Sequence, residues 1–223
     1  MNDYPSGDIQ INGIASSNGG SFRQVSIDGM GTIHGDVTCM EFSCNGTSKV
    51  EGNLRSERAS INGIAKIKGA AHADQLRIDG KVTIQGKLTG EDIQMNGHIK
   101  IHGNCEAERF ESNGIFIIQG MLNADIIEIT AQGGCSAHEI VGEQITIKHA
   151  GSQFMTKLLG VFMNTHVTAT TIEGDYISLE HATATVVRGG RISIGPDCII
   201  ERVEYKDELH IHPSSKVKYH TQI

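Results

Sequence analysis

Residues 78–86 read IDGKVTIQG, and residues 95–103, seventeen positions further on, read MNGHIKIHG. The same pattern runs through the first half of the chain, with Asx-Gly pairs at 28–29, 45–46, 62–63, 79–80, 96–97 and 113–114. A second glycine follows at the same interval of 17, from Gly35 to Gly120. An interval held to the residue over six repeats is typical of structures in which equivalent segments stack on one another.

Apolar residues alternate between these glycines, as expected of strands with one buried face. In one repeat the inward pairs are Leu76 with Ile78 and Val82 with Ile84, and the next pair begins at Leu88. Successive pairs start 6, 6 and 5 residues apart, so each repeat holds three short strands and three turns. The Asx-Gly pair suits the first turn because both residue types tolerate left-handed backbone angles.

Antiparallel hairpins do not require so strict an interval, whereas parallel coils stacked about 4.8 Å apart do. The sequence therefore predicts an all-β fold, a β-solenoid with a three-sided core and about 17 residues per coil. In this register Leu76 lies between Ala59 and Ile93, and Ile84 lies between Ile67 and Ile101.

The interval breaks after residue 130 and returns near the C-terminus, where Ile192 and Ile194 repeat as Leu209 and Ile211. The predicted organisation is an N-terminal tail, a regular β-helix, a hydrophobic insertion with helical spacing, a second β-helical segment and a C-terminal tail, at 1–8, 9–148, 149–167, 168–217 and 218–223.

The insertion reads SQFMTKLLGVFMN at 152–164 and is too short to span a membrane. Six large apolar residues recur at helical spacing around one charge, Lys157: Phe154, Met155, Leu158, Leu159, Phe162 and Met163. Two interpretations are open. The segment contacts a membrane surface or a partner, or it covers the break between the two solenoid segments.

Composition excludes several classes of function. The net charge is −7 and no basic run stands out, which argues against nucleic-acid binding, and no phosphate-binding loop predicts nucleotide binding. The N-terminus lacks the features of a signal peptide, so we expect a cytoplasmic protein. The five cysteines show no CxxC spacing, which predicts small buried hydrophobes and neither disulfides nor a zinc site.

Some solenoids are enzymes, and the hexapeptide acyltransferases and trimeric carbonic anhydrases both depend on histidine. We expect the 11 histidines of this chain not to gather. His34 and His102 share a ladder position four coils apart, and His98 and the pair His210 and His212 are predicted to point outward. No catalytic, cofactor or metal residue is therefore predicted, and a hexapeptide-type enzyme is kept as the alternative.

Two outward ladders carry charge. The positions Thr32, Lys49, Lys66, Thr83, Lys100 and Ile117 are biased toward lysine, and the turn positions Glu57, Asp74, Glu91, Glu108 and Asp125 are all acidic. One interpretation is a code for lateral docking between molecules. The other is that the turns are simply solvated and that Arg58 and Arg109 neutralise them locally.

The stretch SINGIAKIKGAAHADQLRIDGKVTIQGKLTGEDIQMNG (60–97) resembles the bactofilins, polymer-forming cytoskeletal proteins of bacteria, and the resemblance covers residues 9–130. Residues 173–205 are similar to the C-terminal half of the longer bactofilin-like proteins of bacilli. The resemblance implies a right-handed β-helix with a triangular core and filaments formed without nucleotide. It also implies a scaffold for cell shape, envelope or motility machinery at the inner face of the membrane. The chain departs from the family pattern because it has no long proline-rich tails and no short hydrophobic tag at its N-terminus.

The ends of a solenoid expose unpaired strand edges, which are normally covered by a capping element. Only eight residues precede Ile9 and six follow Val217, so neither end has an obvious cap. We therefore expect a homopolymer formed by end-to-end stacking, with a paralogue and the membrane surface as further partners. The predicted polymer-end residues are Ile9, Ile11, Leu209, Ile211 and Val217. A monomeric adaptor whose charged stripes bind other proteins is a third hypothesis.

Overall fold

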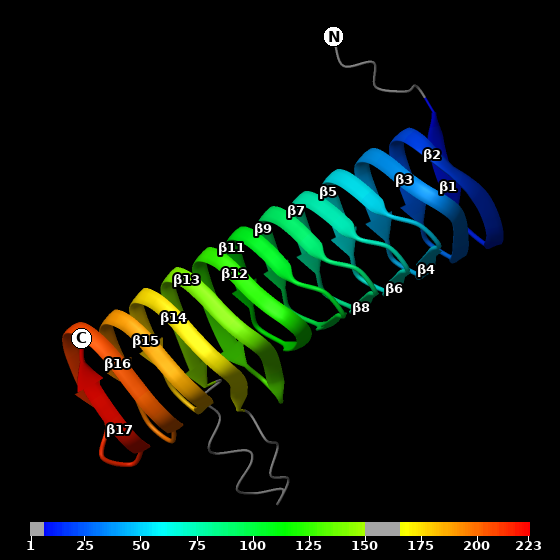
Figure 1. Cartoon of the computed structure of the whole chain (residues 1–223). Helices are drawn as coiled ribbons and strands as arrows, with labels where there is room; N and C mark the ends of the chain where they lie inside the picture. The colour runs from blue at the N-terminus through cyan, green and yellow to red at the C-terminus, as the bar shows by residue number, and fades with distance from the viewer. Residues whose placement is uncertain (1–6, 150–165) are drawn as a thin grey trace, which may run out of the picture. The chain divides into compact units, whose positions relative to one another are not determined.

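The computed structural model describes residues 7–149 and 166–223, which form seventeen strands and no helix (Figure 1). The strands are β1 (Asp8–Ile11), β2 (Ile14–Ile27), β3 (Met30–Cys44), β4 (Thr47–Val50), β5 (Leu54–Ile61), β6 (Ile64–Ile67), β7 (Ala71–Ile78), β8 (Lys81–Ile84), β9 (Leu88–Met95), β10 (His98–Ile101), β11 (Cys105–Ser112), β12 (Ile115–Ala131), β13 (Cys135–His149), β14 (Val167–Leu179), β15 (Ala182–Ile194), β16 (Ile199–Ile211) and β17 (Lys216–Gln222). The chain divides into two compact units, residues 1–108 and 109–223, and the boundary falls within β11.

Unit 1 is a parallel β-solenoid whose strands pair with their counterparts one coil away. The ladder through β5, β7 and β9 aligns Leu54 with Ala71 and Ala71 with Leu88, a step of 17 at each coil. The shorter strands β4, β6, β8 and β10 pair in the same way. The predicted all-β solenoid with about 17 residues per coil is confirmed.

The core register is also the predicted one. Leu76 pairs with Ala59 on one side and with Ile93 on the other, and Ile84 pairs with Ile67 and Ile101. Each coil has three inward pairs, because the eight-residue strands bend at positions such as Glu57 to cover two faces and the four-residue strands cover the third. In β5 and β6 the apolar inward side chains are all buried, so removal of this surface from water is the main force holding the coils together.

The reason predicted for the glycines is wrong. Within unit 1, the Asx-Gly glycines from Gly29 to Gly97 do not adopt left-handed backbone angles. They are required because each lies against the backbone of the preceding coil, so that a Cβ placed on Gly63 would lie 1.9 Å from the carbonyl oxygen of Gly46. Close approach between coils, and not turn geometry, selects glycine here.

The Asx residues of the same turns stack as a side-chain ladder. Asn45 donates from Nδ2 to Oδ1 of Asp28 at 2.6 Å, and Asn62 donates to Oδ1 of Asn45 at 2.9 Å. Asn96 donates to Asp79 at 2.8 Å. A short amide or carboxylate is therefore selected at this position because it bonds to its own counterpart one coil away.

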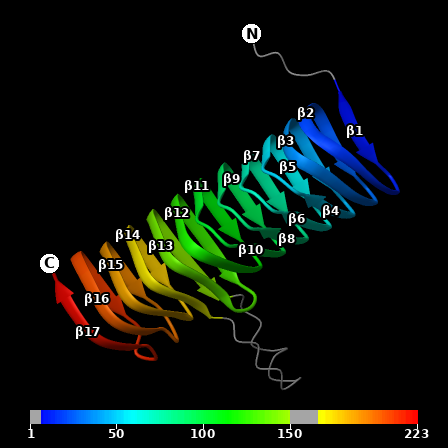
Figure 2. The same ribbon diagram turned by 45° about the vertical axis from the view of Figure 1, so that its right-hand side comes forward.

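Unit 2 is also a parallel solenoid, but its coils differ in length. The ladder step is 18 at Ile127 and Ile145, 32 at Ile145 and Ile177, 15 at Ile177 and Ile192, and 17 at Ile192 and Leu209. Figure 2 shows β14, β15 and β16 in successive coils of this unit. The predicted repetition of Ile192 and Ile194 as Leu209 and Ile211 is confirmed.

Residues 150–165 lie outside the described residues, and so do the six apolar residues predicted there: Phe154, Met155, Leu158, Leu159, Phe162 and Met163. In the part of the chain that is described, no helix is long and apolar enough to cross a membrane. All five cysteines are buried and reduced, as predicted, and burial raises the pKa of the Cys39 thiol to about 12.

Candidate interaction surfaces

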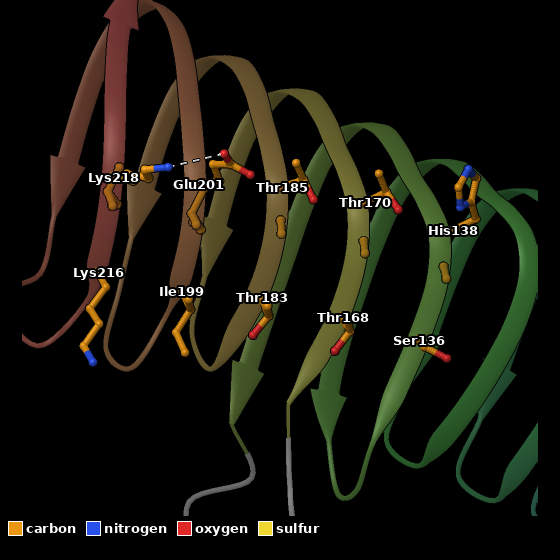
Figure 3. Close-up of a pocket in the computed structure, with 15 residues that line it drawn as sticks. Ser136, His138, Thr168, Thr170, Thr183, Thr185, Ile199, Glu201, Lys216 and Lys218 are labelled. Carbon is orange, nitrogen blue, oxygen red and sulfur yellow. Dashed lines mark ion pairs between the residues drawn. The ribbon is translucent and has the colours of Figure 1, made fainter.

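The largest groove lies on one sheet face of unit 2 and has a volume of 720 Å³ (Figure 3). Two rows of outward side chains cross it, one of them Ser136, Thr168, Thr183, Ile199 and Lys216, and the other His138, Thr170, Thr185, Glu201 and Lys218. The inward residues under this face include Ala137, Ala169 and Ala184. Apart from the Lys218–Glu201 ion pair at 3.7 Å, the rows offer neutral hydroxyls, which suit contact with a polar surface.

Unit 1 has a smaller groove, of 450 Å³, over the second face of its coils. The row Glu41, Arg58, Gln75 and Asp92 lines it, one residue per coil. Arg58 donates to Oε1 of Glu41 at 2.7 Å, so the main charge pair of this row is satisfied internally.

The third face of unit 1 is rich in lysine. We call the outward positions of β4, β6, β8 and β10, with the position that follows each strand, the lysine face. Its charged members are Lys49, Glu51, Lys66, Lys68, Lys81 and Lys100. Glu51 binds Lys49 at 2.7 Å, His34 at 2.7 Å and Lys68 at 3.1 Å. Hydrogen bonds from Lys49, His34 and Lys68 lower the pKa of Glu51 to about 2.

The bend between the first two faces carries one carboxylate per coil. The acidic row of unit 1 consists of Glu57, Asp74, Glu91 and Glu108, at steps of 17. Arg58 and Arg109 were expected to neutralise it, but Arg58 is bonded to Glu41, and Arg109 contacts Glu128 and Glu111. Neutralisation by these arginines therefore reaches Glu57 at most, as a second charge neighbour of Arg58.

The expectation that the histidines do not gather is wrong for three of them. His149, at the end of β13, stacks on His181 with ring centroids 4.2 Å apart, and His166 meets the same ring edge-on at 5.7 Å. Nε2 of His181 lies 3.6 Å from Oδ2 of Asp197. The pKa of His181 is lowered, chiefly by desolvation and then by the neighbouring His149.

Sequence reasoning missed this histidine cluster because the ladder step between β13 and β14 is 32 residues, which brings His149 beside His181. The similar spellings KHA and EHA at 148–150 and 180–182 were the available signal. Within residues 7–149 and 166–223, no group of three histidine, cysteine or acidic side chains is arranged to hold a metal ion.

The other predicted positions are placed as follows. His98, His102, His210 and His212 occupy outward positions, and His212 is bonded to Ser214 at 3.0 Å. Ile9 and Ile11 are buried in the first coil against Val25 and Ile27. In the last coil Leu209, Ile211 and Val217 are only half-buried.

Comparison with known proteins gives one family. Residues 4–89 match the bactofilins, a family described as polymer-forming cytoskeletal. The chain carries a bactofilin domain. This segment lies wholly within unit 1, where the interval of 17 is most regular.

Two relatives of the bactofilin chain come from Bacillus subtilis (strain 168). The uncharacterized protein YhbE is 37% identical over 106 residues, and the uncharacterized protein YhbF is 35% identical over 104 residues. Each alignment covers 46% of this chain, and it covers 43% of YhbE and 42% of YhbF, so the chain spans less than half the length of these relatives. No solved structure matches it.

Proposed function

We propose that this chain is a non-enzymatic cytoskeletal scaffold that assembles end to end, coil on coil, into filaments without nucleotide. The description of the bactofilin family as polymer-forming supports self-association. The coil geometry suggests how it occurs, because a solenoid whose coils pair by parallel backbone ladders can continue the same ladder into a second molecule.

One observation carries the proposal: the inward positions of the outermost described coils are not covered. In the last coil Leu209, Ile211 and Val217 are half-buried, whereas their ladder counterparts Ile192, Ile194 and Ile200 are at most 2% exposed. In the first coil Ala15 is exposed, although its counterpart Gly31 is buried. Stacking of one end on another would bury this apolar surface.

Negative-stain electron microscopy of the purified protein without nucleotide tests the proposal, and we expect filaments. Ala15→Asp and Ile211→Glu each place a carboxylate in an end surface and should shorten or abolish them. Ile199→Glu is the matched control for Ile211→Glu, since Ile199 lies on the adjacent coil but points outward and is 52% exposed. Uniform trimers, or filaments unaffected by both end variants, would contradict end-to-end stacking.

We further propose that the scaffold works at the cytoplasmic face of the membrane and supports cell shape, envelope or motility machinery. The apolar residues Phe154, Leu158 and Phe162 would make the membrane contact. Replacing the three by serine should abolish co-sedimentation with lipid vesicles and leave the far-ultraviolet circular dichroism unchanged. Loss of the β-sheet signal would instead indicate that the segment covers the solenoid core.

A further inference from the structure

Charge is strongly segregated in unit 1. The whole chain has a net charge of −7, yet the lysine face carries five lysines and a single carboxylate, Glu51. The acidic row lies at the bend between the other two faces, so in a three-sided coil it occupies the corner opposite the lysine face. A molecule therefore cannot bring its own two charged surfaces together.

Much of the lysine face is not neutralised within the molecule. Lys49 and Lys68 share Glu51, and the low pKa of that carboxyl reflects the cations gathered around it. Lys66, Lys81 and Lys100 form no ion pair with any described residue. Lys66 and Lys81 are also fully exposed. Three consecutive coils thus present one unpaired ammonium each.

The acidic row presents a matching series. Asp74 contacts His72 at 3.0 Å, while Glu91 and Glu108 form no ion pair within the described ranges. Successive members of both surfaces are one coil apart, which is about 4.8 Å for stacked parallel strands. Like charges at this spacing repel one another, and opposite charges inserted at the same spacing would relieve that repulsion.

We propose that the lysine face of unit 1 docks the acidic row of a second copy of this chain, so that filaments associate side by side. The contact pairs the coils of Lys66, Lys81 and Lys100 with those of Asp74, Glu91 and Glu108 of the neighbouring copy. Because the two surfaces lie on opposite sides of the coil, each molecule binds one neighbour on each side, and the association extends into bundles or sheets. An anionic lipid surface would attract the lysines but would leave the acidic row without a partner, whereas a second copy satisfies both.

The inference rests on the proposed filament in its main readout, and charge reversal tests it. The triple variant Lys66→Glu, Lys81→Glu and Lys100→Glu, and the triple variant Asp74→Lys, Glu91→Lys and Glu108→Lys, are imaged at about 50 mM and about 500 mM salt. These concentrations correspond to Debye lengths of roughly 14 Å and 4 Å. We expect wild-type bundles at low salt that separate into single filaments at high salt, single filaments for each variant at both salt concentrations, and bundles again when the two variants are mixed. The control Lys148→Glu, Lys206→Glu and Lys216→Glu changes the net charge as much as the first variant but lies in unit 2, and should leave the bundles intact.

Each other outcome overturns the inference. Single wild-type filaments at low salt, or bundles of undiminished width in both variants, would show that the two surfaces do not pair. Loss of binding to phosphatidylglycerol vesicles by the first variant, with bundling retained, would assign the lysine face to a membrane. If no filaments form at all, the proposed function fails, and sedimentation velocity then decides the lateral contact: a salt-sensitive dimer lost in each variant supports it, and a monomer in wild type overturns it.

Discussion

The two units build the same parallel coil by different rules. In unit 1 the ladder advances by 17 residues through β5, β7 and β9, and every turn is spelled in nearly the same way. In unit 2 the step varies from 15 to 32 residues. The comparison shows that the backbone ladder and the apolar core tolerate coils of different length, because only the inward residues and the paired backbone must remain in register.

What the constant interval adds is identity of neighbours on the outside. When every coil has the same length, each outward side chain lies next to its own counterpart, so amides form ladders and charges form rows. When the length changes, unlike positions meet, and this is how His149 comes to stack on His181 in unit 2.

The largest effect that would separate these rules is expected at the coil-contact glycines of unit 1. Gly63→Ala would place a Cβ 1.9 Å from a backbone oxygen of the preceding coil, and the coils must move apart to accept it. We expect a loss of about 2–4 kcal/mol in the free energy of unfolding, measured by urea denaturation. Gly13→Ala is the matched control, because Gly13 follows an asparagine in the same way but has no atom within 4 Å of the added Cβ, and it should change the stability by less than about 0.5 kcal/mol. Equal effects in the two variants would mean that turn conformation, and not contact between coils, selects glycine.

A smaller effect is expected from the Asx ladder. Asn62→Ala removes the donor to Asn45 and should lower the free energy of unfolding by about 0.5–1.5 kcal/mol, the usual range for one hydrogen bond. Asn12 occupies the corresponding turn of the first coil, is exposed and makes no such bond, so Asn12→Ala should be nearly neutral. A neutral Asn62→Ala would show that the ladder follows from the stacking of coils and does not stabilise it.

Much of unit 1 could be predicted because its interval is constant. Once Leu76 is placed over Ala59, every other pair follows by adding 17, including the lysine face and the acidic row. The physical role of the glycines could not be predicted, since the approach of one backbone to another becomes visible only when the coils are stacked. Neither could the partners of Arg58 and Arg109, because long side chains choose among several carboxylates within reach.

Unit 2 could be predicted only in part. The alternation of Ile192 and Ile194 identifies strands, but the register across the step of 32 depends on how many residues leave the ladder between β13 and β14. The histidine cluster depends on that number. A shift of one residue would turn His149 away from His181, so no pattern within either strand could reveal the contact.

The smallest effect concerns acid stability, and it distinguishes the units by pH. In unit 2 the pKa of His181 is lowered from 6.5 in the folded state by burial and by His149 and His166, against the opposing charges of Asp197 and Glu180. The unfolded chain therefore binds more protons below pH 6.5, and stability falls as the pH drops through that value. In unit 1 the pKa of Glu51 is lowered from 4.5 to about 2, so its contribution is lost only as the pH falls from 4.5 toward 2.

His181→Asn tests this difference, because asparagine tolerates the left-handed backbone at this position, where φ is 49°. Thermal midpoints measured from pH 8 to pH 5 should fall less steeply in His181→Asn than in wild type. Glu51→Gln should retain the wild-type slope over that range and lose part of the slope below pH 4.5, since its carboxylate is removed. If His181→Asn keeps the full wild-type slope between pH 8 and pH 5, other groups govern acid stability there and the histidine cluster contributes none of it.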